Sequence, residues 1–487
     1  MMKQAARIRW NTLFSLLSSG IRLLTNFLLF FSLARFYGPE AFGQFITAHT
    51  LSTLLLMLAD FGLDLLLTTK VAQQRAQADR LFQSFGSLKM LFSAVAVLLM
   101  WLIPLAHDFS GTTRGMIYIF SFSIVFNALA NFFFALFKGF EQLQHETWVS
   151  LVVNVVLLIC LVLLGIFRAP IWWFAAAFTA TRALALVLAA IIATRFIGLR
   201  TPSINIQEWK EVMRQGWVFG VYLLCGTLFF QLDTLLLALW QGDYVVGIYQ
   251  SVMKLVALVL VLPDVANSVL LPVLSRFYHE NEQRWIQLGR LLNKALWLLG
   301  LPIALIFFVF AEEVLHILYG SEKFAPAVPI MRVAAFIILL RYAWEAYGLL
   351  LTTSGRQLVK MVIVVAATAI TVVLNFYAIP RYGAEGAIWV SLLVNLFVAA
   401  GFAWSARPYF KQWTLEARYI LPGIFIMMIG IVLWQARTLS RWYILIAAFT
   451  LYAFIFYFIG FTKEERRLVF FAGQKPGVPP KPIHFTN

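Results

Sequence analysis

Long apolar runs, separated only by short clusters of glycine, proline and charge, occupy almost the whole sequence. A chain in which 62% of residues are hydrophobic and 12% are charged cannot shield its apolar side chains in a water-soluble core. Each run is close to the length of about 20 residues that an α-helix needs to cross the hydrocarbon layer of a membrane. The sequence therefore predicts an all-α polytopic membrane protein.

Cutting the chain at the polar clusters gives about fourteen transmembrane spans. No small-residue cleavage site follows the first run, so we expect that run to be retained as a helix. The predicted spans are 11–36, 43–69, 83–106, 115–137, 147–167, 170–196, 215–241, 245–275, 288–311, 328–353, 357–379, 384–406, 417–435 and 442–461.

The distribution of lysine and arginine predicts the orientation of these spans. With the N-terminus placed in the cytoplasm, 26 of the 38 basic residues fall on the inner side, Lys89 among them, and 7 on the outer side. This asymmetry follows the positive-inside rule and predicts that both termini are cytoplasmic. Topology and attraction to anionic membrane lipids account for the net charge of +16, so no nucleic-acid partner is expected.

The segment "ARFYGPEAFGQF" at residues 34–45 returns 204 positions later as "ALWQGDYVVGIY". Shared positions include the two glycines of each turn and an acid further along: Gly38 and Gly242, Gly43 and Gly247, Asp60 and Asp264. An even number of spans separates the copies, which predicts two six-helix lobes related by a pseudo-twofold axis along the membrane normal. The glycines either serve close packing, which we favour, or have a functional role.

These features divide the chain into four regions. The N-lobe covers residues 1–203, the C-lobe 204–410, two extra helices 411–462, and a flexible cytoplasmic tail 463–487. The amphipathic segment 204–217 predicts a short helix that lies on the inner membrane surface and links the lobes.

Several stretches resemble the polysaccharide transporters, the Wzx-type flippases of the MATE-like MOP exporter superfamily. They are "YGPEAFGQF", "LADFGLDLLLTTKVA", "QLDTLLLALWQGDYVVGIYQSVMKL", "LPVLSRFY" and "IPRYGAEGAIWVSLLVN". The resemblance implies lobes arranged as a V and alternating access through a central polar cavity. It also implies the cargo, an oligosaccharide on a polyprenyl diphosphate, flipped across the bacterial cytoplasmic (inner) membrane for O-antigen, capsule or exopolysaccharide synthesis. A polysaccharide polymerase and a chain-length regulator become candidate partners.

Ionisable residues inside the spans are costly in hydrocarbon, so they face either a water-filled cavity or a partner of opposite charge. Depth along neighbouring helices predicts that Asp233 pairs with Lys254 and that Arg22 pairs with Asp60, while Arg341 and Glu345 lie one turn apart on one helix. Structural ion pairs are one interpretation of all these charges.

The other interpretation is a binding site for a lipid diphosphate. Arginine binds such an anion through two parallel hydrogen bonds, and lysine binds it as a point charge. The candidate ligands are Arg22, Arg182, Lys254 and Arg341, and the candidates for ion pairing or for proton or cation coupling are Asp60, Asp233, Asp264 and Glu345.

The sequence offers little for catalysis. Its six histidines show no metal-ligand spacing, it has no phosphate-binding G-x-x-x-x-G-K-[ST] loop, and its predicted outer loops are short. We therefore expect no enzyme activity, no metal and no cofactor. The alternatives that remain are a cation-coupled MATE-type exporter of drugs or metabolites and a flippase for a peptidoglycan lipid precursor.

Overall fold

The computed structural model describes residues 2–198, 205–320, 322–409, 423–425, 428–433, 450 and 452, without the side chains of residues 2–13, 15–19, 218, 219, 222 and 409. This part is almost entirely helical and contains no strand. The N-terminal half contains α1 (Met2–Asp60), α2 (Leu63–Gln73), η1 (Arg75–Gln77), α3 (Ala78–Ala106), α4 (Gly111–Gly139), α5 (Leu143–Ile166) and α6 (Trp172–Ala193). Then follow α7 (Ile206–Trp240), α8 (Asp243–Glu280), α9 (Glu282–Val309), α10 (Ala311–Tyr319), η2 (Glu322–Phe324), α11 (Ala327–Thr353), α12 (Gln357–Ala406) and η3 (Arg407–Tyr409).

Ten of the described helical segments are long and apolar enough to cross a membrane. Two of them hold a backbone break, α1 at Gly38 and α12 at Gly383, and each is long enough to cross twice. They therefore match the first twelve predicted spans, and the expected polytopic all-α fold is confirmed. The predicted spans 417–435 and 442–461 and the tail 463–487 lie largely or wholly outside the described residues.

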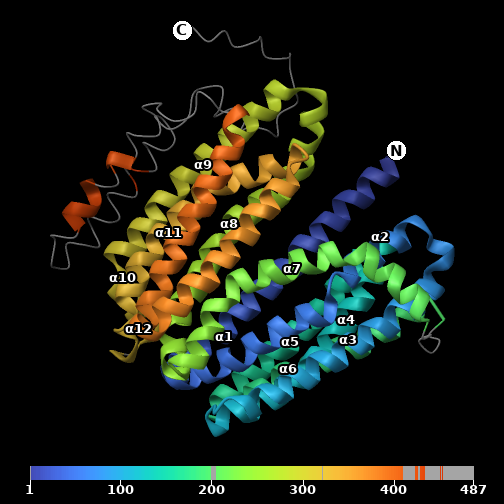
Figure 1. Ribbon diagram of the computed structural model, residues 1–487, viewed down its shortest axis with the longest axis horizontal. Coiled ribbons are helices and arrows are strands. Elements are labelled where there is room, and N and C mark those ends of the chain that lie inside the picture. Colours follow the sequence, from blue (N-terminus) through green and yellow to red (C-terminus); the bar gives the residue numbers. More distant parts are fainter. Residues whose placement is uncertain are drawn as a thin grey trace.

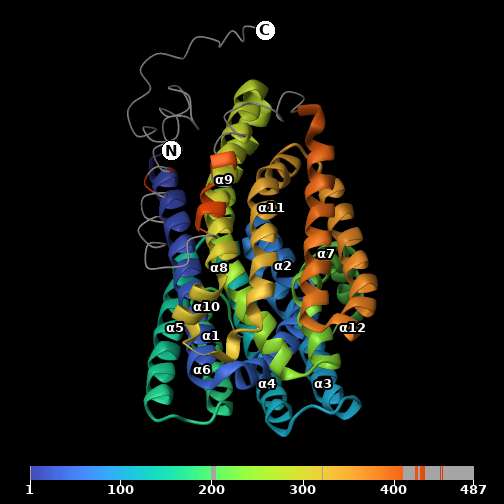
Figure 2. The same ribbon diagram turned by 90° about the vertical axis from the view of Figure 1, so that its left-hand side faces the viewer.

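The helices form two lobes, the N-lobe (α1–α6) and the C-lobe (α7–α12). In the N-lobe α4 packs on α1 and α6, and in the C-lobe α11 packs on α8, α9 and α12. Figure 1 shows the blue and cyan N-lobe and the yellow and orange C-lobe meeting where α8 begins and separating toward the end that holds the N-terminus. Figure 2 shows the helices of the C-lobe running alongside one another.

The lobes meet through the repeated turns, and the contact is reciprocal. Gly38 has φ 80° and ψ 179°, and its repeat partner Gly242 has φ 83° and ψ 175°. A Cβ on Gly43 would lie 1.7 Å from the Asp243 carbonyl oxygen, and one on Gly247 would lie 1.9 Å from the Pro39 carbonyl oxygen. The 204-residue shift also relates Pro39 to Asp243, so the two contacts are equivalent under a twofold rotation. Close packing accounts for these glycines.

Polar side chains close the same contact. The Asp243 carboxylate accepts hydrogen bonds from Thr47 at 2.8 Å and from Thr113 at 2.6 Å, both in the N-lobe. Arg35 donates to the carbonyl oxygens of Ile317 and Leu318 near the end of α10, at 2.8 and 2.7 Å. The lobes are therefore joined at the end of the molecule that holds the repeated turns around Gly38 and Gly242, which we call the turn end.

The linker helix differs from its prediction. Residues 206–240 form one continuous helix, α7, and its first turns pack on the N-lobe. Trp209 donates to Ser87 at 2.9 Å, and Arg80 pairs with Glu208 at 2.8 Å. The hydrogen bond from Arg80 lowers the pKa of Glu208. Gly220 lies within α7, where the absence of a side chain allows close contact with the Phe61 ring. The helix continues through this glycine, so the prediction of a separate short helix was wrong.

Candidate functional site

Three cations from three helices gather between the lobes: Arg22 on α1, Arg182 on α6 and Lys254 on α8. We refer to them as the cation cluster. The Lys254 Nζ lies 4.2 Å from the ring centre of Phe30, and the Arg182 Cζ lies 4.4 Å from that of Phe178. Such cation–π contacts favour a desolvated positive charge without neutralising it. Lys254 lies eleven residues into α8, about 16 Å from the turn end.

One direct repulsion and one shared neighbour connect the members of the cation cluster. Arg22 repels Arg182, and both Arg182 and Lys254 act electrostatically on the ring of His49. Among the described residues, none of the three cations forms an ion pair with a carboxylate. The buried Nε of Arg182 also has no hydrogen-bond partner there. Positive charge without a counter-charge inside a membrane protein favours binding of an anion.

Asp233 does not pair with Lys254, and this predicted ion pair was wrong. The Asp233 carboxylate accepts hydrogen bonds from Tyr249 at 2.8 Å, Asn375 at 2.6 Å and Ser391 at 2.6 Å. Equal depth on adjacent helices fixes the height of two side chains but not the helix faces from which they project.

In the described part of the chain, no three His, Cys, Asp or Glu side chains are grouped to hold a metal ion.

The predicted pair of Arg22 and Asp60 was also wrong. Asp60 and Asp64 both bind Lys89, at 2.6 and 2.8 Å, and Lys89 is fully buried within α3. The sequence count had assigned Lys89 to the inner surface because it lies near the start of its span. Its apolar neighbours in "SLKMLF" were the signal for a membrane position.

Arg341 belongs to a different group, in the C-lobe. Its Nε donates to Asn395 at 3.2 Å, and its Cζ lies 4.6 Å from the ring centre of Phe230. The carboxylates of Glu345 and Asp264 act electrostatically on it, although no ion pair within 4.0 Å forms between Arg341 and either acid. Asn267 donates a hydrogen bond to Glu345. The structure therefore separates Arg341 from the other three predicted ligands.

Residues 8–278, more than half of the chain, match a family described as "Polysaccharide biosynthesis protein". The chain belongs to this family. No curated protein matches its sequence.

The solved structures to which this chain is similar include membrane transporters. A lipid II flippase, MurJ, in an inward closed conformation has a TM-score of 0.73 at 13% identity, over 92% of this chain and 99% of its own. An inward-facing multidrug resistance MATE family transporter of the MOP superfamily has a TM-score of 0.63 at 13% identity, over 79% and 94%. A MOP superfamily transporter from Pyrococcus furiosus has a TM-score of 0.57 at 14% identity, over 83% and 95%. At such identities the similarity establishes the fold.

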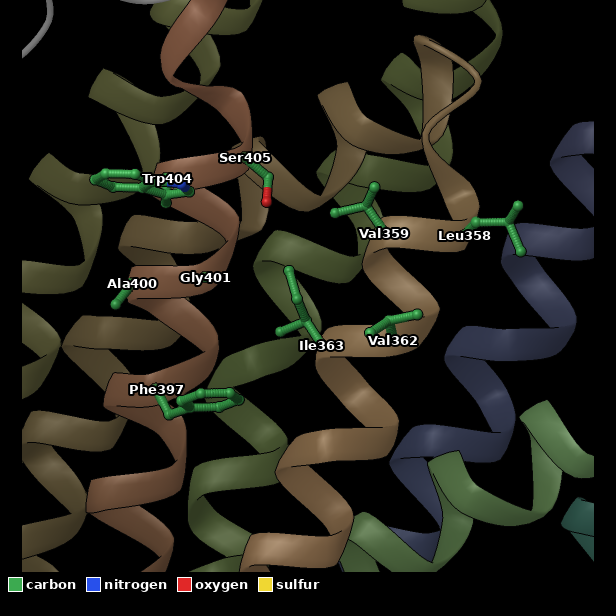
Figure 3. A pocket seen from close by; sticks show the side chains of 9 residues that line it. All are labelled: Leu358, Val359, Val362, Ile363, Phe397, Ala400, Gly401, Trp404 and Ser405. Atoms are coloured by element: carbon green, nitrogen blue, oxygen red, sulfur yellow. The ribbon is translucent and has the colours of Figure 1, made fainter.

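A groove of about 640 Å³ on this family member runs between the two halves of α12. Figure 3 shows its lining, which consists of apolar residues such as Leu358, Ile363, Phe397 and Trp404 and one residue with a hydroxyl group, Ser405. None of the predicted site residues lines it. Its apolar lining suits lipid chains and offers nothing to bind a diphosphate.

Proposed function

We propose that this family member moves an oligosaccharide carried on a polyprenyl diphosphate from the inner to the outer leaflet of a bacterial cytoplasmic membrane. The observation that supports this proposal most strongly is the cation cluster, which has no carboxylate partner among the described residues. A diphosphate supplies the missing negative charge. Arg22 and Arg182 would grip its oxygens with paired hydrogen bonds, and Lys254 would add a point charge.

The arrangement of the lobes suits alternating access. Both lobes contribute to the cation cluster, and they are joined at the turn end, which the positive-inside count predicts to lie on the outer side of the membrane. In this state the cluster would be reached from the cytoplasmic leaflet, where lipid-linked sugars are assembled. Opening the turn contact and closing the opposite end would then expose it to the outer leaflet.

The proposal keeps the regions defined above: lobes at 1–203 and 204–410, a helix pair at 411–462 and a cytoplasmic tail. It assigns the diphosphate to Arg22, Arg182 and Lys254. It no longer includes Arg341 among the ligands, because Arg341 lies with Glu345 and Asp264 in the C-lobe. Asp233 and Asp264 remain candidates for coupling to a proton or cation. A polysaccharide polymerase and a chain-length regulator would act on the flipped product.

The cation cluster also bears on the two alternative functions, a cation-coupled exporter and a flippase for a peptidoglycan precursor. An exporter of cationic drugs would need an unpaired carboxylate near its cargo, whereas the three charges of the cation cluster are positive. A peptidoglycan precursor carries the same diphosphate, so the cluster does not distinguish that lipid from a polysaccharide precursor. The family match with polysaccharide biosynthesis favours the latter.

Variants of the cation cluster test the proposal in cells that lack their own copy of the gene. Lys254→Ala and Arg182→Ala each remove one charge-assisted contact, and we expect surface polysaccharide to fall by about tenfold or more while protein abundance in the membrane is unchanged. Arg276→Ala is the control, because Arg276 is exposed and pairs only with Glu280 on its own helix. Normal polysaccharide in both cluster variants would contradict the proposal.

A further inference from the structure

A second charged group lies inside the N-lobe, at the junction of α1 and α2. Lys89 of α3 binds Asp60 and Asp64 at the same time, at 2.6 and 2.8 Å. We refer to these three residues as the Lys89 triad. Lys89 lies eleven residues into α3, about 16 Å from the start of that helix, so the triad lies at membrane depth.

The triad carries an uncompensated charge. Two carboxylates and one ammonium leave a net charge of −1, and a charge at this depth is costly unless it is neutralised. Among the described residues, the only charges that act electrostatically on the triad are those of its own three members. No charged side chain in the described parts of the neighbouring helices α4 and α7 adds to them. The side chains of Asp60 and Asp64 remain 14% and 20% exposed, so protein does not fully enclose them.

The two carboxylates flank a strained helix break. Asp60 ends α1, Phe61 and Gly62 have φ of 40° and 79°, and α2 begins at Leu63. A positive φ is unusual for phenylalanine and costs conformational energy unless other contacts hold it. The Asp60 carboxylate accepts a hydrogen bond from the backbone N–H of Asp64 at 3.2 Å, so the charge of the triad helps to hold the break.

The break is in direct contact with the helix that joins the lobes. A Cβ on Gly220 of α7 would lie 2.6–2.8 Å from the Phe61 ring, so the ring occupies the space that a larger residue would need. The first turns of α7 pack on the N-lobe, and its end packs on α12 of the C-lobe. A change at the break therefore reaches α7 through one aromatic ring.

We infer that the Lys89 triad is a proton-binding site that controls how α7 packs against the N-lobe. Uptake of one proton by the carboxylate pair brings the net charge of the triad to zero and weakens the hydrogen bonds around the break. The Phe61 ring is then free to shift against Gly220, and α7 loosens from the N-lobe. Only the further step, in which this movement serves transport, rests on the function proposed above.

Infrared spectroscopy of the purified full-length protein in lipid nanodiscs tests the site. On titration from about pH 8 to about pH 5, the wild type should gain the C=O band of one protonated carboxyl group that Asp64→Asn lacks. Lys89→Met should move this band to higher pH, because the ammonium favours the charged carboxylates. Asp108→Asn is the control, since the Asp108 side chain is 99% exposed and lies outside the triad, so this variant should keep the band.

Hydrogen exchange measures the effect on α7 in the same samples. After division by the intrinsic exchange rate at each pH, the protection of residues 206–222 should fall as the pH falls in the wild type, and it should not depend on pH in Asp64→Asn. Equal bands in the wild type and Asp64→Asn, or a band that disappears when sodium chloride replaces choline chloride, would overturn the inference. Neither measurement contains lipid-linked sugar, so its result is independent of the proposed transport function.

Discussion

Asp233 is a buried acid whose surroundings are neutral. Its carboxylate accepts hydrogen bonds from Tyr249 of α8, Asn375 and Ser391 of α12, and all of these groups are at most partly exposed. Charged and uncharged donors thus satisfy the intramembrane acids in different ways, since Asp60 and Asp64 rely on a lysine. The individual acids of this chain are therefore not interchangeable.

Removing one donor from Asp233 should destabilise the C-lobe. Asn375→Ala leaves a buried carboxylate short of one hydrogen bond, which costs about 1–3 kcal/mol and should lower the midpoint of thermal unfolding in detergent. Asn127→Ala is the matched control, because Asn127 donates only to Ser123 of its own helix. An unfolding midpoint for Asn375→Ala as high as that of the control would show that the Asp233 network adds no stability.

Residue types were easier to predict than their partners. Arg182 and Lys254 stood out because single cations interrupt long apolar runs. The partners of Asp60 and Asp233 could not be found in this way, because their hydrogen bonds come from residues distant in sequence, such as Lys89, Asn375 and Ser391. Which helix faces meet is decided by packing between elements.

At the scale of elements, two helix pairs define the contact between the lobes. The break of α1 at Gly38 and the start of α8 at Gly242 have the same backbone geometry, and Gly43 and Gly247 bring their backbones together. The internal repeat in the sequence predicted this equivalence. It could not predict that the turns touch each other, because a repeat fixes symmetry and not the distance from the axis.

A methyl group at the crossing should open the contact. In Gly43→Ala the new Cβ would lie 1.7 Å from the Asp243 carbonyl oxygen, so the lobes must move apart at this end. Cysteines at Thr47 and Asp243, whose side chains now share a 2.8 Å hydrogen bond, report the separation by disulfide formation in membranes. We expect the yield to fall severalfold in Gly43→Ala.

The control for this experiment is Gly115→Ala, because nothing lies within 4 Å of a Cβ at Gly115. It should leave the disulfide yield at the level of the parent cysteine pair. Equal yields in Gly43→Ala and the control would contradict the tight crossing of the two turns.

At the scale of the whole molecule, hydropathy and the repeat were sufficient to predict the fold. Twelve predicted spans have counterparts in the described helices, and the two lobes follow from the 204-residue shift. The composition of the central site was only partly predictable. Of the four predicted diphosphate ligands, Arg341 lies with Glu345 and Asp264 in the C-lobe, because the path of α11 carries it there.

Transport of a defined lipid in a reconstituted system tests the central claim most directly. Purified protein in liposomes that contain a fluorescent sugar on polyprenyl diphosphate should move this lipid between leaflets, which a membrane-impermeant quencher detects. Arg276→Ala should match the wild type, and the double variant Arg182→Ala, Lys254→Ala should be as slow as protein-free liposomes. Equal rates with the wild type, the double variant and no protein would contradict the claim that the cation cluster carries a lipid diphosphate across the membrane.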